Sequence, residues 1–279
     1  MKYSRSTPYL LLARSIGVTE IADPPTLRVS PETSLGAVLE ELSTCGESDP
    51  WCLVRDEQRV YGWLVQEDDV FFQGSLDSAA GEEATPIIPE VMLSASTSLL
   101  ELPALFLKHY CYFVLTGNEI THLVSFQDMD RLPMRLCLFS LVMQLESKLL
   151  ELLSIDWSSL ERYLTCLPPA RLKKAQDLCR EKYKHETPPR LLLCTTFVDK
   201  KQLLRHVPGI MSKLPFHSKN EIDQAFKRIE TVRNQIAHGD SVMLVLSSPE
   251  KFSDFIDELQ GIIAALSAIV EEKIEEWLP

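Results

Sequence analysis

The sequence predicts an α+β protein with a mixed α/β first half and an all-α second half. Within residues 26–131, short apolar strands alternate with helical segments, and this pattern occurs twice. Beyond residue 132, apolar residues recur at the three- and four-residue spacing of helices. Charge divides the chain at the same place: residues 1–130 hold 7 basic and 20 acidic residues, net −13, and residues 131–279 hold 21 and 20, net +1. We therefore expect two parts that meet near residue 131.

The first unit is expected over residues 26–72. Its apolar residues alternate in the short stretches and follow helical spacing in the longer one, and Gly, Pro, Asp and Ser separate them. The expected elements are a strand at 27–29, a helix from about Ser34, strands at 51–54 and 60–65, and Asp68 just past the last strand.

The same unit returns later in the chain. Residues 52–68 align without a gap on residues 112–128, with apolar residues on apolar residues and Asp68 on Asp128. We therefore expect a second unit over residues 91–131, packed face to face with the first so that both sheets are buried. The remaining segments of this half are expected to be a weakly ordered lead at 1–25 and a connecting loop at 73–90.

This repeat resembles a tandem CBS-domain pair, in which Gly, two apolar residues, Thr or Ser, two residues and Asp form a nucleotide signature. The second unit carries Ser125 and Asp128, with His122 in place of the Gly. The first unit carries Gly62 and Asp68, with Val65 in place of the hydroxyl residue. The resemblance implies an adenine nucleotide as regulatory ligand and a pair that dimerises. Alternatively, both Asp residues simply cap short helices, and in the acidic first half a bound nucleotide would need a nearby cation, Arg131 or Arg135.

The second half, 132–279, is predicted to be a bundle of helices. Proline and glycine mark most of the boundaries. The expected helices are a long one from about Pro133, one or two over 156–185 broken at Pro168-Pro169, one from 191 to 207 that ends at Pro208-Gly209, one over 218–238, and a last one from Ser248.

The helix over 218–238 ends in a group of residues that could carry chemistry. Asn234 and His238 are four residues apart and share a face, Arg233 flanks that face, and Gly239 is expected to end the helix in a left-handed conformation. Histidine changes charge near neutral pH, and the C-terminus of a helix favours its cationic form. A proton-transfer group beside a cation suits cleavage of RNA by its own 2′-hydroxyl. Alternatively, these residues form a solvated helix end with a capping histidine and carry no chemistry.

The pattern Arg-Asn-x-x-x-His in an all-α domain resembles the HEPN superfamily. This resemblance implies a metal-independent endoribonuclease that needs no catalytic cofactor, leaves 2′,3′-cyclic phosphate ends, and pairs two domains around one cleft. It also makes Glu146 a candidate for orienting Arg233 or His238. Some HEPN toxins carry a tyrosine two residues after the histidine, where this chain has Asp240, so control by modification of that tyrosine is not expected here.

The surroundings of the motif are basic in sequence. Residues 171–233 hold 15 basic and 7 acidic residues, as an RNA-binding surface would require, although solvated helix faces would look the same. Seven cysteines without a CxxC pair indicate reduced thiols and a cytoplasmic protein, and we expect neither a metal site nor a membrane span. The expected partners are RNA, an adenine nucleotide and a second copy of the chain. The alternative is a non-catalytic nucleotide sensor that binds RNA or protein, and a role in toxin or phage-defence systems is compatible with the nuclease reading.

Overall fold

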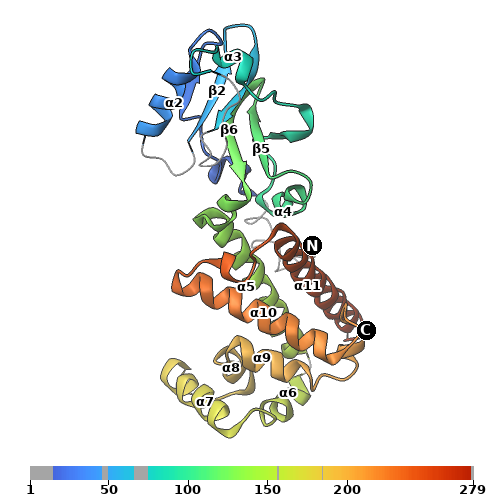
Figure 1. Ribbon diagram of the computed structural model, residues 1–279. Helices are drawn as coiled ribbons and strands as arrows, with labels where there is room; N and C mark the ends of the chain where they lie inside the picture. The colour runs from blue at the N-terminus through green and yellow to red at the C-terminus, as the bar shows by residue number, and fades with distance from the viewer. Residues whose placement is uncertain (1–14, 46–49, 66–74, 156, 184, 278–279) are drawn as a thin grey trace. The chain divides into compact units, whose positions relative to one another are not determined.

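The computed structural model describes residues 15–45, 50–65, 75–155, 157–183 and 185–277 (Figure 1). These residues form two compact units, which we describe separately. One unit comprises residues 17–129, and the other comprises residues 130–279 together with Ser15 and Ile16.

The compact unit of residues 17–129 contains two three-stranded sheets, one in each repeat, with the same topology. In each, the first strand runs parallel to the second, and the second pairs antiparallel with the third. The strands are β1 (Leu27–Val29), β2 (Trp51–Arg55) and β3 (Val60–Val65), then β4 (Met92–Ser94), β5 (Cys111–Thr116) and β6 (Glu119–Ser125). The strands predicted at 27–29, 51–54 and 60–65 in the first repeat end within one residue of these bounds.

Strand register shows that the two sheets are equivalent residue by residue. Val29 lies opposite Val54 in the first sheet, and Leu93 lies opposite Val114 in the second. The ladder shifts register directly after Val54 and again directly after Val114. A bulge is a specific feature of a strand pair, so its recurrence sixty residues later supports the repeat in the sequence.

A serine caps the helical segment of each repeat. The Ser34 side chain accepts a hydrogen bond from the Ala37 N–H at the start of α2 (Leu35–Thr44). The Ser98 side chain accepts from the Leu100 N–H at the start of η3 (Leu99–Glu101), which continues into α4 (Leu102–Phe106). The two caps are 64 residues apart, as the aligned β1 and β4 residues are.

The expected lead and connecting loop are both structured where the chain is described: the lead packs on the second repeat, and the loop packs on the first. Before the first repeat, η1 (Val18–Glu20) is followed by Asp23, which pairs with Leu123 of β6. Between the repeats, α3 (Ala80–Glu83) is followed by Thr85, which pairs with Trp63 of β3. The expectation of a weakly ordered lead is therefore wrong for residues 15–25, because Val18 and Ile21 are fully buried. Each repeat is completed by a segment that lies outside it.

The two sheets share an apolar core. The Trp51 and Trp63 rings of the first sheet meet the Phe113 ring of the second edge to face, with centroids 5.7 and 5.3 Å away. Leu53 and Ile120 are buried in the same cluster. The expected face-to-face packing of the sheets is therefore present within this unit.

The second unit is a helical bundle built around one long helix. The central helix is α5 (Leu132–Ile155), and it packs against α11 (Pro249–Trp277), α9 (Phe197–Leu204) and α10 (Lys219–His238) (Figure 1). The remaining helices are α6 (Trp157–Leu164), α7 (Pro169–Tyr183) and α8 (Pro188–Leu193). Leu136, which the helical spacing of apolar residues places on the apolar face of α5, is 47% exposed. In the described part of the chain, no helix is long and apolar enough to cross a membrane.

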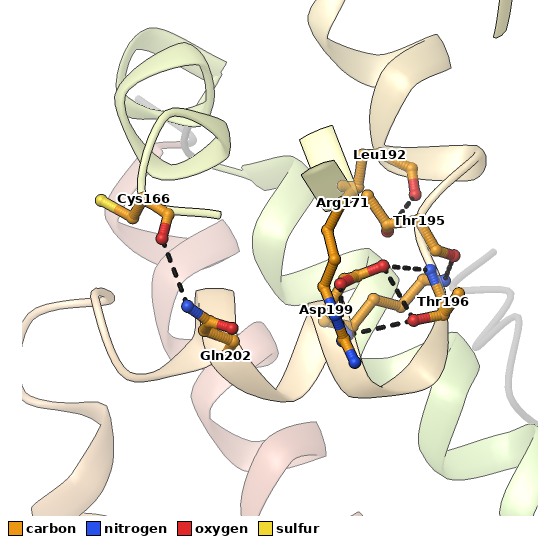
Figure 2. A network of polar contacts seen from close by, with 8 residues as sticks. Cys166, Arg171, Leu192, Thr195, Thr196, Asp199 and Gln202 are labelled. Atoms are coloured by element: carbon orange, nitrogen blue, oxygen red, sulfur yellow. Dashed lines mark hydrogen bonds and ion pairs between the residues drawn. The ribbon is translucent and has the colours of Figure 1, made fainter. Parts of the chain in front are cut away.

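The helix expected over 191–207 is broken into α8 and α9. Thr196 and Asp199 form a capping box that starts a new helix: the Thr196 N–H and hydroxyl donate to Asp199 Oδ2, and the Thr196 hydroxyl accepts from the Asp199 N–H (Figure 2). Arg171 of α7 adds an ion pair to Asp199 Oδ1 at 2.9 Å. The local cap overrides the continuous apolar pattern.

Candidate functional site

The motif lies in the last turn of α10, whose two ends are both capped. At its start, the Ser218 hydroxyl accepts from the Glu221 N–H, and the Glu221 carboxylate accepts from the His217 N–H. At its end, Gly239 has φ +82°, and the Gly239 and Asp240 N–H groups donate to the Ile236 and Gln235 carbonyls. This is the Schellman arrangement. The predicted left-handed Gly239 is confirmed.

The three motif residues occupy the same helix end. His238 is exposed, while Arg233 and Asn234 are partly buried. The Arg233 Nη1 donates to Asn234 Oδ1 over 3.1 Å. The Arg233 Nε is buried and makes no hydrogen bond with any residue in the described ranges. A buried unpaired donor is unusual in a structural arginine and is compatible with a functional one.

The segment after the motif is hydrogen-bonded to the start of α5 and to Asp130, two residues before that helix. Arg135 Nη2 donates to the Asp240 carbonyl at 2.6 Å, and the Val242 N–H donates to Asp130 Oδ1 at 2.9 Å. Asp240 and Val242 follow His238 by two and four residues. Neither bond can be predicted from a local pattern, because each joins residues more than 100 positions apart. Arg135, which the sequence offers as a cation for a bound nucleotide, binds this backbone carbonyl.

Glu146 has a different partner from the one expected. Its Oε1 accepts from the Lys200 Nζ at 2.9 Å, and Lys200, 3% exposed, also donates to the Thr195 carbonyl. Arg135 marks the end of α5 that meets the motif loop, and Glu146 lies eleven residues further, about 16 Å along the helix. Glu146 therefore joins α5 to α9 and does not orient Arg233 or His238.

Ion pairs use much of the basic charge of residues 171–233. Arg228 pairs with Glu258 at 2.6 Å, Arg205 pairs with Asp223, and Lys213 pairs with Glu272. Arg171, Arg180 and Lys200 are also paired. The excess of +8 in the sequence therefore overstates the cations that remain for a phosphate backbone. Lys219 and Lys227 are exposed on the motif helix itself.

The two proposed nucleotide-binding residues of the second repeat, Ser125 and Asp128, are hydrogen-bonded to each other. The Ser125 N–H and hydroxyl both donate to Asp128 Oδ2, at 2.7 and 3.1 Å, at the start of η4 (Phe126–Asp130). Asp128 is 8% exposed. The pair has the form of a helix cap, so a ligand that uses the Ser125 hydroxyl as a donor must replace its bond to Asp128.

In the first repeat, Asp68 lies outside the described residues. Gly62 lies in β3, where a Cβ atom would clash with the Thr85 carbonyl oxygen. This close approach gives Gly62 a packing reason of its own.

The cysteines are all free. Burial raises the pKa of the Cys52 and Cys137 thiols to about 12, so both stay protonated near neutral pH. These two thiols are core residues without nucleophilic character.

No protein-family model matches the chain, and no curated protein matches its sequence.

Proposed function

We propose that the protein is a metal-independent endoribonuclease of the HEPN type, regulated by an adenine nucleotide that binds the CBS-like unit. The observation that carries the proposal is the arrangement at the end of α10: an exposed His238 and, one turn before it, the Arg233–Asn234 pair. These are the groups that the HEPN resemblance assigns to catalysis.

In the proposed reaction, the ribose 2′-oxygen attacks the adjacent phosphorus, and the bond from phosphorus to the 5′-oxygen breaks. His238 transfers a proton, either from the attacking 2′-hydroxyl or to the leaving 5′-oxygen. Arg233 neutralises the charge that grows on the phosphoryl oxygens. Asn234, which already accepts a hydrogen bond from Arg233, fixes the guanidinium. The products are a 2′,3′-cyclic phosphate and a 5′-hydroxyl.

Two copies of the chain would place two motifs around one cleft, since a twofold axis brings a surface onto itself. One histidine could then deprotonate the 2′-hydroxyl while the second protonates the leaving oxygen. This pairing comes from the resemblance to HEPN domains, which also predicts that the CBS-like units pair.

Nucleotide binding is proposed at Ser125 and Asp128 of the second repeat. The Asp128 carboxylate would accept from ribose hydroxyls, and the Ser125 hydroxyl would donate to phosphate after release from Asp128. Calorimetry with AMP, ADP and ATP tests this part: we expect wild-type protein to bind one of them and Asp128→Ala to lose that heat.

Cleavage of mixed RNA in excess EDTA tests the nuclease. We expect wild-type protein to cut, and Arg233→Ala and His238→Ala to lose about 100-fold or more in rate, since each removes a transition-state contact. Arg162→Ala is the matched control, because Arg162 is an exposed arginine of α6 whose hydrogen bond is local, to Ser159. If either motif variant cuts at the wild-type rate, the assignment is wrong. Folded wild-type protein that never cuts RNA would instead favour the non-catalytic sensor.

A further inference from the structure

We propose that Asp130 and Arg135 are positioning residues that clamp the chain after α10 and thereby fix His238. The proposal rests on the nuclease function above for its kinetic consequences. Its geometry stands on two hydrogen bonds: the Arg135 guanidinium of α5 donates to the Asp240 carbonyl, and the Val242 N–H donates to the carboxylate of Asp130, two residues before α5.

The two bonds hold the backbone of residues 240–242, directly after the motif. No side chain packs over Gly239, because a Cβ atom built there would meet nothing within 4 Å in the described part of the chain. The backbone after His238 is therefore anchored by the Schellman bonds of α10 and by Asp130 and Arg135. Exposed helix ends fray easily. Removing the clamp should loosen the last turn, which carries the histidine.

The clamp is specific in chemistry. Arg135 is a cation that binds a backbone carbonyl next to the negative end of the helix dipole, and Asp130 is an anion that accepts a backbone N–H. Both are charge-assisted hydrogen bonds, which are stronger than neutral ones. Val242 is the first residue of η6 (Val242–Leu244), so the Asp130 bond also sets where that turn starts.

The primary test is amide hydrogen exchange at Gly239–Val242 in the full-length protein, which needs no enzymatic activity. We expect the Val242 amide to exchange about tenfold faster in Asp130→Ala, from loss of one charge-assisted hydrogen bond. Asp130→Asn keeps an acceptor oxygen and should restore part of the protection. Arg135→Ala should accelerate exchange at Gly239 and Asp240, with partial rescue in Arg135→Lys, and Arg162→Ala should leave all these amides unchanged. Wild-type protection in both alanine variants would overturn the clamp.

Kinetics separates the clamp from the nuclease proposal. If wild-type protein cuts RNA, we expect Asp130→Ala and Arg135→Ala to lower kcat about tenfold with KM nearly unchanged, because the histidine is misplaced while RNA binding remains. Wild-type kcat in both variants refutes the positioning role and leaves the nuclease standing. If wild-type protein does not cut RNA, the nuclease proposal fails, and the exchange data alone decide whether the clamp exists. Should an alanine variant fail to fold, Asp130→Asn and Arg135→Lys, which weaken the bonds without removing them, should show a smaller change in the same direction.

Discussion

At the scale of single residues, we expect alanine to destabilise the protein at Gly62 and to stabilise it at Gly261. Alanine at Gly62 would drive its Cβ atom into the Thr85 backbone, so we expect the first unit to lose about 1–3 kcal/mol of stability. Alanine at Gly261 would meet only the Pro215 side chain at 3.6 Å and would favour the helical backbone of α11, gaining about 0.5–1 kcal/mol.

Amide exchange in β3 and in α11 measures the two effects separately, since the chain has two units and a single unfolding transition is not assured. Equal stability of Gly62→Ala and wild-type protein would show that the 84–85 segment does not lie against β3. Gly62 would then lose its packing explanation, and its place in the nucleotide signature would be the reason for the glycine.

The motif residues could be chosen from sequence because their relation is local: Arg233, Asn234 and His238 lie within six positions, and the helix fixes how they face. The Schellman end could be predicted for the same reason. Glu146 could not be assigned correctly, because its partner, Lys200, lies 54 positions away on another helix. Asp130 and Arg135 were missed for the same physical reason, with even larger separations.

At the scale of elements, the break between α8 and α9 shows which local signal was overlooked. Thr196-x-x-Asp199 is a capping box in the sequence, but it lies inside a stretch whose apolar residues suit one continuous helix. Burial alone would raise the pKa of Asp199. Hydrogen bonds from the Thr196 N–H and hydroxyl and the Arg171 ion pair outweigh burial and lower that pKa below its usual value.

This lowered pKa predicts how the stability of α9 depends on pH. A carboxylate with a depressed folded-state pKa stabilises the fold above its unfolded pKa, near 4, and loses this contribution as the pH falls through the folded value. We expect Asp199→Asn to cost about 1–2 kcal/mol at pH 7 and progressively less as the pH falls below 4.

Amide exchange in α9 at several pH values measures the difference. Asp177→Asn is the control, because the Asp177–Arg180 pair is exposed, at 3.4 Å, and such pairs contribute little. A difference between Asp199→Asn and wild-type protein that stays constant from pH 7 to pH 3 would contradict the ionised capping box.

At the scale of the whole molecule, the repeat can be seen in the sequence, but the packing of the lead and the connecting loop on the repeats cannot. Strand alternation and the sixty-residue offset predicted two equivalent sheets and their shared core. In the described residues, the segment around Gly17–Asp23 forms isolated bridges with the second repeat, and the segment around Ala79–Thr85 forms isolated bridges with the first. Such short pairings leave no periodic pattern. The second repeat therefore depends on residues that precede the first one.

The central claim is that Arg233, Asn234 and His238 break RNA through its own 2′-hydroxyl, and the chemistry of the product ends tests it most directly. The substrate is an end-labelled RNA, compared with the same RNA carrying a single 2′-deoxynucleotide at the main cleavage position, both in EDTA. We predict 2′,3′-cyclic phosphate and 5′-hydroxyl ends, and no cleavage at the deoxy position. Products with 3′-hydroxyl and 5′-phosphate ends, or undiminished cleavage at the deoxy position, would contradict the claim.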